Sequence, residues 1–477
     1  MRSASGPRVA RIFHTLLGFV LLAAWLSLGQ QVQLLIGSDG LLPLAPLAEE
    51  ILAQDIAWLR FPSLLLLAPG DAALKIGIAV GVALALCAIA GFEARAACLL
   101  SAPLYLAYTV ACRDFTAFQW DNLLIECCVL AAWLPRRATA PTAHWLMRLL
   151  LFKLYLESGI AKAQSHLGDW FDGSAMSFYY ETAPLPAWPA WYFHHLPDAW
   201  HSLESWGAMG LEGLGAFLIL GNRTCRLAAL TFFTSFQLIN LATANYGFFV
   251  YLTLALHVFL LDDRDCAILD RLLPRRLRDA RSPNHASHTP RRIARVGIAL
   301  FAPCWIAASL ITACLHFSGS REIQRTLRPI EDSYRSLRVA NAYHLFGHIT
   351  RERIEPEFQT RERGDWSAHS LHYKPGDPAR AAPLVAPHQP RVDFQLWFYG
   401  LSYRRETPRY VRALLDKLCH DPEVVQGLFP EPLPARPEAV RIEFWQYHFT
   451  TPEERQASGN WWRRASLGTL PPLDCTP

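Results

Sequence analysis

The hydrophobic and polar positions divide the chain into two parts. Up to residue 316, long apolar runs alternate with short polar segments, whereas residues 317–477 mix apolar and charged positions closely. Apolar runs of about 18 residues with few charges are typical of transmembrane helices. The candidate spans are 12–36, 72–92, 96–112, 119–134, 145–163, 205–221, 224–243, 246–261 and 293–316. The pattern therefore predicts an α-helical multi-pass membrane bundle of about nine spans over residues 1–316.

The second part, residues 317–477, has the pattern of a soluble domain rich in β-structure. Residues 440–449 alternate apolar and polar positions, as a half-buried strand does, and 369–373 resemble a short strand that leads into a turn. Residues 408–419 instead have apolar positions at 411, 414, 415 and 418, which is helical spacing. We expect a mostly β domain with at least one helix.

Positive charge is unevenly distributed between the predicted loops. The loop 164–204 has no Lys or Arg, whereas basic residues gather in three other segments: Arg136, Arg137 and Arg148; Arg223 and Arg226; and, within the loop 262–292, Arg264, Arg271, Arg275, Arg276, Arg278, Arg281, Arg291 and Arg292. Short cytoplasmic loops carry an excess of Lys and Arg. With the N-terminus in the cytoplasm, nine spans place every basic segment inside, and they place 37–71, 164–204 and the tail outside.

The loop 164–204 contains a stiff, aromatic stretch, YYETAPLPAWPAWYFHHLP (179–197). Tyr and Trp favour the membrane–water boundary, and proline removes backbone freedom. Two interpretations fit: a cap on the bundle, or a rigid apolar surface that binds a client protein or lipid. The second assigns client contacts to Tyr180, Glu181, Trp188, Trp191, His194 and His195. No Cys/His/Asp spacing accompanies the two histidines, so we expect no metal site.

Ionisable residues also lie inside predicted spans, where they need partners. Span four contains Asp121 and Glu126, and span five contains Lys153, Glu157 and Lys162, with His166 just beyond it. Lys153 and Glu157 are four residues apart and share one helix face, so we expect them to pair. One interpretation is that ion pairs join spans four and five. The alternative is an acid–base site built from Lys153, Glu157, Lys162 and His166.

Other chemical signatures are few. Most of the eleven cysteines lie inside spans, and there is no CxxC motif. Cys419 and Cys475 are the two in the tail, and they can pair if the tail is exported. No phosphate-binding loop, dinucleotide fingerprint or Ser-His-Asp order occurs. We therefore expect no cofactor, no use of ATP and no nucleic-acid partner.

Several long blocks, in order, resemble the lipase maturation factor family. They are FQWDNLLIE (118–126), FKLYLESGIAK (152–162), SHLGDW (165–170), YYETAPLPAWPAWYFHHLP (179–197), LFGHITRERIE (345–355), YKPGDPARAAPLVAPHQPRVDFQLWF (373–398) and WWRR (461–464). The resemblance covers the chain from about residue 100 to its end. Tyr179 and Ala183 depart from it, since the family has His and Gln at those places.

The resemblance implies a multi-pass membrane protein of the endoplasmic reticulum in animals, which acts as a chaperone-like factor for the folding and assembly of secreted lipases. The membrane half is also similar to the HTTM-like superfamily that includes the vitamin-K-dependent carboxylase, which is the source of the enzyme alternative. Forty arginines against five lysines suggest a GC-rich bacterial genome. A bacterial member would lie in the inner membrane with its tail in the periplasm.

Overall fold

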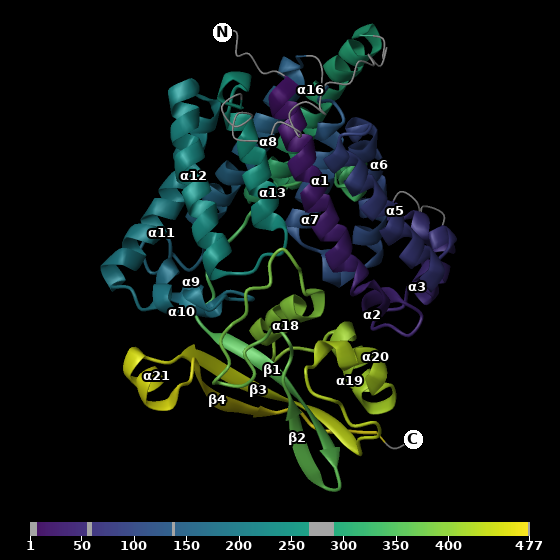
Figure 1. The fold of residues 1–477 in the computed structure, drawn as a ribbon, viewed down its shortest axis with the longest axis vertical. Coiled ribbons are helices and arrows are strands. Elements are labelled where there is room, and N and C mark those ends of the chain that lie inside the picture. Colours follow the sequence, from purple (N-terminus) through teal and green to yellow (C-terminus); the bar gives the residue numbers. More distant parts are fainter. Residues whose placement is uncertain (1–6, 55–59, 136–138, 267–290, 476–477) are drawn as a thin grey trace.

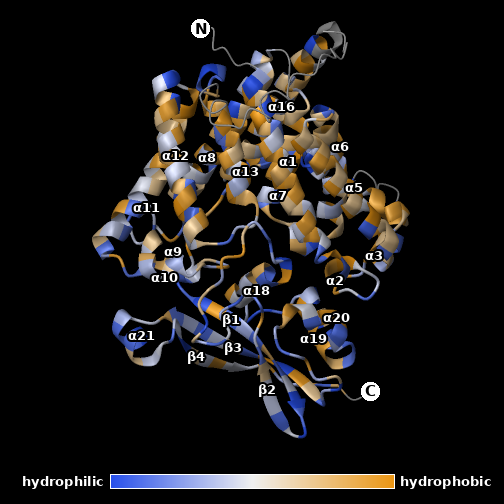
Figure 2. Cartoon of the chain, in the orientation of Figure 1, coloured by the Kyte–Doolittle hydropathy of each residue, from blue (hydrophilic) through white to orange (hydrophobic). Residues whose placement is uncertain are grey.

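A computed structural model describes residues 7–54, 60–135, 139–266 and 291–475. Helices form a bundle at one end of the molecule, and a sheet with flanking helices forms the other end (Figure 1). Apolar residues dominate the bundle, whereas polar residues dominate the sheet end (Figure 2). Arg136, Arg137 and most of the predicted basic loop 262–292 lie outside the described residues.

Five helices of the described chain are long and apolar enough to cross a membrane, which supports a multi-pass membrane protein. They are α1 (Pro7–Gly29), α5 (Asp71–Ala90), α6 (Ala94–Ala111), α12 (Arg223–Thr243) and α16 (Arg291–Phe317). Many of their apolar side chains are exposed, including Ile76 and Leu86 of α5 and Leu300 and Leu310 of α16. Such exposure suits a lipid environment.

Four further helical segments fall on the remaining predicted spans. They are α7 (Gln119–Ala131), α8 (Pro141–Ala163), α11 (Asp198–Gly213) with η3 (Gly215–Leu220), and α13 (Phe249–Leu256) with η4 (His257–Leu260). The first is short, the second carries several charges, and the last two change to 3₁₀ geometry before their ends. Length and composition therefore support five spans, and the count of about nine stays a prediction.

Short helices connect the long ones. They are α2 (Val32–Ile36), α3 (Leu44–Leu52), η1 (Leu64–Leu67), η2 (Arg113–Thr116), α9 (Ala175–Thr182) and α10 (Pro189–His194). Helices α2, α9 and α10 lie at the end of the bundle nearest the sheet (Figure 1). After α16, the helices α17 (Arg321–Asp332) and η5 (Arg335–Leu337) lead into the tail. The predicted outer loops and the tail thus lie at the same end of the bundle (Figure 1).

The described basic residues meet acidic partners at the opposite end. Asp262 pairs with Arg148 at 3.5 Å and with Arg226 at 2.9 Å. The backbone N–H of Val9, at the start of α1, donates to Asp263 at 3.1 Å. The start of α1, the turn before α12 and the residues after η4 therefore share one end, as the charge pattern predicts.

The tail is built on one antiparallel sheet. Its strands are β1 (Arg353–Glu362), β2 (Asp365–His369), β3 (Ala439–Phe449), β4 (Trp462–Thr469) and β5 (Leu473–Asp474), in the order β2-β1-β3-β4 with β5 beside β3. Val440, Ile442 and Phe444 of β3 are buried, which is the alternation that the sequence shows. The strand predicted at 440–449 is confirmed, whereas the one at 369–373 is wrong because β2 ends at His369.

Helices pack beside this sheet. They are α18 (Arg391–Leu401), α19 (Arg409–His420), α20 (Pro422–Val425), η6 (Gln426–Leu428) and α21 (Pro452–Ser458). The helix expected at 408–419 corresponds to α19, which packs against β3, while α18 packs against β1. A disulfide joins Cys419 at the end of α19 to Cys475 at the end of the sheet. The pairing left open by the sequence is therefore present.

Candidate functional site

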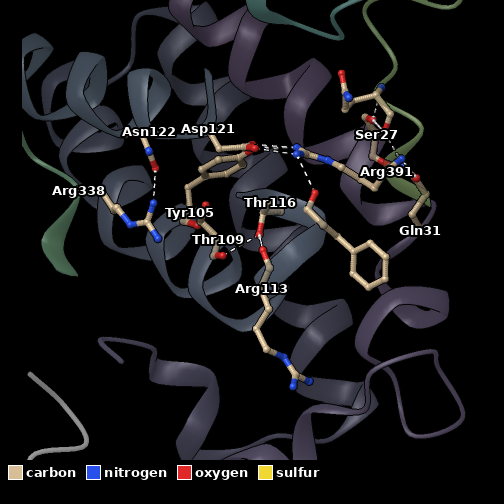
Figure 3. A network of polar contacts seen from close by, with 12 residues as sticks. Ser27, Gln31, Tyr105, Thr109, Arg113, Thr116, Asp121, Asn122, Arg338 and Arg391 are labelled. Atoms are coloured by element: carbon tan, nitrogen blue, oxygen red, sulfur yellow. Dashed lines mark hydrogen bonds and ion pairs between the residues drawn. The ribbon is translucent and has the colours of Figure 1, made fainter. Parts of the chain in front are cut away.

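The charged residue nearest the start of α7 binds the tail. Asp121 is fully buried, and its carboxylate accepts hydrogen bonds from Arg391 of α18 at 2.7 and 2.8 Å. Tyr105 of α6 donates a third bond to it at 2.6 Å. Figure 3 shows this contact from the bundle to the tail. Asp121 was expected to pair within the membrane half, and this expectation is corrected because a tail arginine reaches it.

Glu126 joins three parts of the chain. Its carboxylate pairs with Lys153 of α8 at 3.4 Å, which is an ion pair between predicted spans four and five. The same carboxylate accepts hydrogen bonds from Tyr343 Oη at 2.6 Å and Asn341 Nδ2 at 2.9 Å, both in the segment that enters the tail. A single buried carboxylate therefore holds α7, α8 and the tail together.

The expected Lys153–Glu157 contact is replaced by two others. Lys153 points to Glu126, while the Glu157 carboxylate accepts the backbone N–H of Tyr343 at 2.7 Å. The shared helix face was inferred correctly, but the tail supplies a donor that competes for Glu157. The i,i+4 spacing shows which side chains are neighbours and cannot show this third partner.

The remaining candidates of the acid–base hypothesis lie apart. Lys162 is buried, pairs with Glu212 of α11 at 2.5 Å and donates to the carbonyl of Leu345 at 3.0 Å. His166 is exposed, and its ring contacts His348, with 5.0 Å between centroids. A void beside Glu212 measures about 10 Å³, which is room for one water at most. Both lysines thus have carboxylate partners, and the four candidates do not form one cluster.

The aromatic loop, residues 179–197, contacts the end of β3. Glu181 is buried, and its carboxylate accepts hydrogen bonds from His448 Nδ1 at 2.9 Å and from the backbone N–H of Phe449 at 2.7 Å. Trp191 is also buried, and its indole N–H donates to the carbonyl of Thr450 at 3.0 Å. Two residues expected to contact a client therefore contact the protein's own tail.

Arg353 makes a second connection to the same loop. It is fully buried at the start of β1, and its guanidinium donates to the carbonyls of Glu181 at 2.9 Å, Ala183 at 2.5 Å and Pro184 at 3.2 Å. Proline lacks a backbone N–H, so this loop has carbonyls that need donors. Arg353 supplies them, and it also pairs with Glu355 at 2.7 Å.

The electrostatics of this contact follow from burial and hydrogen bonds. Burial acts to raise the pKa of Glu181, but the bonds from His448 and Phe449 outweigh it, so the pKa is lowered. The hydrogen bond to Glu181 raises the pKa of His448. Burial lowers the pKa of His194, whose ring lies 3.9 Å from Glu181. The carboxylate is thus ionised at neutral pH, and His448 is its main titrating partner.

The six predicted client contacts divide by exposure. Tyr180 is buried and donates to Glu204 at 2.9 Å, and Glu181 and Trp191 are buried as described. His194 and His195 are partly buried, and Trp188 is 44% exposed. Tyr192, which the sequence interpretation left out, is 50% exposed. Among the described residues no group of His, Cys, Asp and Glu is arranged to hold a metal ion.

Sequence reasoning missed Glu212 and the two tail arginines. Glu212 is the one ionisable residue in the predicted span 205–221, so the rule that identified Lys153 also applies to it. Arg353 and Arg391 carry no such signal, because arginine in a soluble domain is normally exposed. Their burial depends on the arrangement of the two halves.

Comparison with known proteins connects both halves to one family. The family described as "Lipase maturation factor transmembrane domain" matches residues 8–268, and "Lipase maturation factor C-terminal domain" matches 339–472. Lipase maturation factor 1 from Homo sapiens is 29% identical over 405 residues, which cover 78% of this chain and 69% of the relative.

Other relatives match over nearly the whole chain. The Bos taurus lipase maturation factor 1 is 27% identical over 96% of this chain and 87% of its own length. Human lipase maturation factor 2 is 26% identical over 96% of this chain and 82% of its own length. No solved structure matches the chain.

Proposed function

Because the chain belongs to the lipase maturation factor family, we propose that it is a membrane-anchored factor that assists the folding or assembly of exported proteins. The names of its relatives favour a lipase as the client. The observation that carries the proposal is that family matches cover the helical half and the tail in order. We place the boundary between the membrane domain and the tail domain near residue 317.

The membrane placement follows from the arrangement of charge. In this proposal all nine helical segments cross, the basic end faces the cytoplasm, and the loop 164–204 and the tail face the exoplasmic side. The absence of Lys and Arg from that loop supports this orientation. The Cys419–Cys475 disulfide also supports it, since disulfides persist in oxidising compartments. The arginine-rich composition favours a bacterial inner membrane, and the endoplasmic reticulum is the equivalent in a eukaryote.

The client surface would be the exposed side of α10 with the adjacent tail. Trp188 and Tyr192 are exposed there, and Arg455 of α21 lies 3.5 Å from the ring centroid of Trp461 beside them. Exposed apolar groups with an aromatic and arginine rim are typical of protein-binding surfaces. In this proposal His194 and His195 lie at the edge, while Tyr180, Glu181 and Trp191 fix the shape of the surface.

The test is co-expression with a secreted lipase, scored as lipase activity per mass of secreted lipase. Trp188→Ala should reduce this specific activity several-fold without lowering the amount of this protein in the membrane. Trp145→Ala is the matched control, because Trp145 is 50% exposed at the opposite end of the bundle. If both variants and wild type give equal specific activity, Trp188 does not contact the client.

Two further experiments test the structural role of Trp191 and the identity of the client. Trp191→Ala should lower the amount of folded protein, because deleting a buried Trp side chain costs about 3–5 kcal/mol. Removal of the whole gene should lower lipase specific activity while lipase mass changes little. An unchanged specific activity in the deletion strain would show that lipase is not the client.

A further inference from the structure

A cleft of about 530 Å³ lies where the bundle meets the tail. Its walls come from residues 117–120 at the start of α7, the last turn of α8, residues 179–184, the end of α16, residues 344–350 and α18. The cleft is therefore enclosed by both halves of the protein, and neither half forms it alone. Its volume falls within the range of about 300–1,000 Å³ that is usual for small-ligand sites.

The helix ends place this cleft at a membrane boundary. Helix α7 begins at Gln119, α8 ends at Ala163 and α16 ends at Phe317, and the cleft lies beside all three ends. Trp200 and Trp206 of α11, a helix that starts at the same end of the bundle, are about half exposed. An exposed tryptophan near a helix end, as Trp200 is, is typical of the boundary between hydrocarbon and headgroups.

The side chains inside the cleft are mostly aromatic, and the side chains at its rim are a mixture of histidines and other residues. The interior is formed by Trp120, Tyr179, Tyr246, Phe394 and Trp397, among others. Within the described part of the chain, no Asp, Glu, Lys or Arg lines the cleft. The exposed rim residues are Ala117, Gln164, His316, His344, His348 and Phe398. Such a lining suits an apolar chain that ends in a neutral group able to accept hydrogen bonds.

The imidazole of His344, at the rim, carries no charge at neutral pH. Its pKa is lowered to about 4, mainly by burial and also by His316 and His348 nearby. A neutral imidazole can donate one hydrogen bond. Carbonyl oxygens of an ester match this donor better than a carboxylate that requires a cation.

We propose that the cleft binds one acyl chain of an ester lipid taken from the surrounding bilayer. The chain lies among the aromatic rings, and the ester oxygens meet the imidazoles of the rim. A client protein fits this cleft less well, since a stable protein interface buries about 1,200–2,000 Å² and this cavity has the size of one small ligand. The bound chain would fill the gap between the bundle and the tail.

The experiment uses the full chain reconstituted into vesicles of phosphatidylcholine with a photoreactive diazirine on one acyl chain. After irradiation, labelled peptides are identified by mass spectrometry. We expect labelling of residues 117–120, 344–350 and 394–398 at least fivefold above labelling of the sheet. A parallel arm uses a diazirine-bearing free fatty acid to distinguish the two sources of an acyl chain.

The blocking variant is Ala117→Trp, which places an indole at the rim. It should reduce labelling of the cleft at least fivefold, whereas Ala457→Trp, on the exposed helix α21, should not. If Ala117→Trp fails to reach the membrane, His348→Trp replaces it as a second exposed rim position. The melting temperature of each variant checks that the fold is intact.

Two results would overturn the proposal. One is equal labelling of the cleft in wild type and in a folded blocking variant. The other is labelling by the fatty-acid probe and not by phosphatidylcholine, which would make the ligand a free acid. No lipase is present in either arm, so the outcome is independent of the proposed maturation function.

Discussion

The Asp121–Arg391 pair provides the sharpest test of how the tail is held. The substitution Asp121→Asn keeps the size of the side chain but replaces one carboxylate oxygen with an amide that cannot accept from Arg391. Arg391 is 1% exposed, so its charge stays buried, and it loses its negatively charged partner and one of the two bonds at 2.7 and 2.8 Å. The carbonyl of Phe115, at 3.2 Å, and the hydroxyl of Tyr105, at 3.4 Å, are its other acceptors.

The expected magnitude follows from that burial. Removing one partner of a buried ion pair costs about 3–5 kcal/mol, because the other charge is left uncompensated. Every 1.4 kcal/mol is about tenfold in an equilibrium constant. The fraction of molecules with the tail undocked should therefore rise by about two to three and a half orders of magnitude in Asp121→Asn.

Hydrogen exchange measured by mass spectrometry reports this fraction, because interface amides exchange when the contact opens. The backbone N–H of Gln389 donates to Ser27 at 2.9 Å, and that of Arg391 donates to Gln31 at 2.8 Å. Their exchange should accelerate at least a hundredfold in Asp121→Asn. The control is Glu406→Gln, which breaks an exposed pair with Arg412 and should change little.

The double variant Asp121→Asn/Arg391→Met tests why hydrogen exchange accelerates in Asp121→Asn. If an unpaired buried charge is responsible, removing that charge should restore part of the protection. Wild-type exchange in Asp121→Asn would refute the claim that this pair holds the tail. Equal acceleration in the single and double variants would refute the role of the buried charge.

Three further predictions concern other contacts. Cys475→Ser opens a disulfide across 56 positions and should cost about 4 kcal/mol of tail stability, seen as a lower melting temperature than wild type. Gly81→Ala places a Cβ within 2.3 Å of the Trp25 ring and should reduce the amount of folded protein, whereas Gly210→Ala, with open space, should not. Because the folded-state pKa of His448 is raised, its stabilising contribution is complete below about pH 6.5 and is lost as pH rises through the raised value. His448→Gln should therefore flatten the fall in tail melting temperature above pH 6.5, and an unchanged profile would contradict this contribution.

The sequence predicted the positions of the bundle helices well, because a long apolar run occurs where a helix is surrounded by lipid or by other helices. Each predicted span overlaps a helix, although the first is displaced. The apolar run at 12–36 extends across Gln30 and Gln31, and the structure ends α1 at Gly29 and starts α2 at Val32. Two uncharged glutamines between apolar residues are tolerated inside a span, so the sequence did not show that the helix ends there.

The partners of the buried charges could not be predicted. Helical spacing shows that Lys153 and Glu157 share a face, but Tyr343, which binds Glu157, is 186 positions away along the chain. The aromatic loop presents the same difficulty. The Tyr and Trp content of the loop indicates a position near the membrane boundary. The sequence does not show that the end of β3 covers Glu181 and Trp191 while the side chain of Trp188 remains exposed.

The blocks that carry the family resemblance are largely the blocks that join the two halves. FQWDNLLIE contains the carboxylates that bind Arg391 and Tyr343, and YYETAPLP provides the carbonyls that bind Arg353. Arg353 contacts Ala183 through its backbone carbonyl, so this bond does not depend on the side chain at position 183. Separation of the halves would break these hydrogen bonds and would leave Asp121 without its arginine partner. The tail is therefore a fixed part of the membrane bundle, and any client would meet a preformed surface.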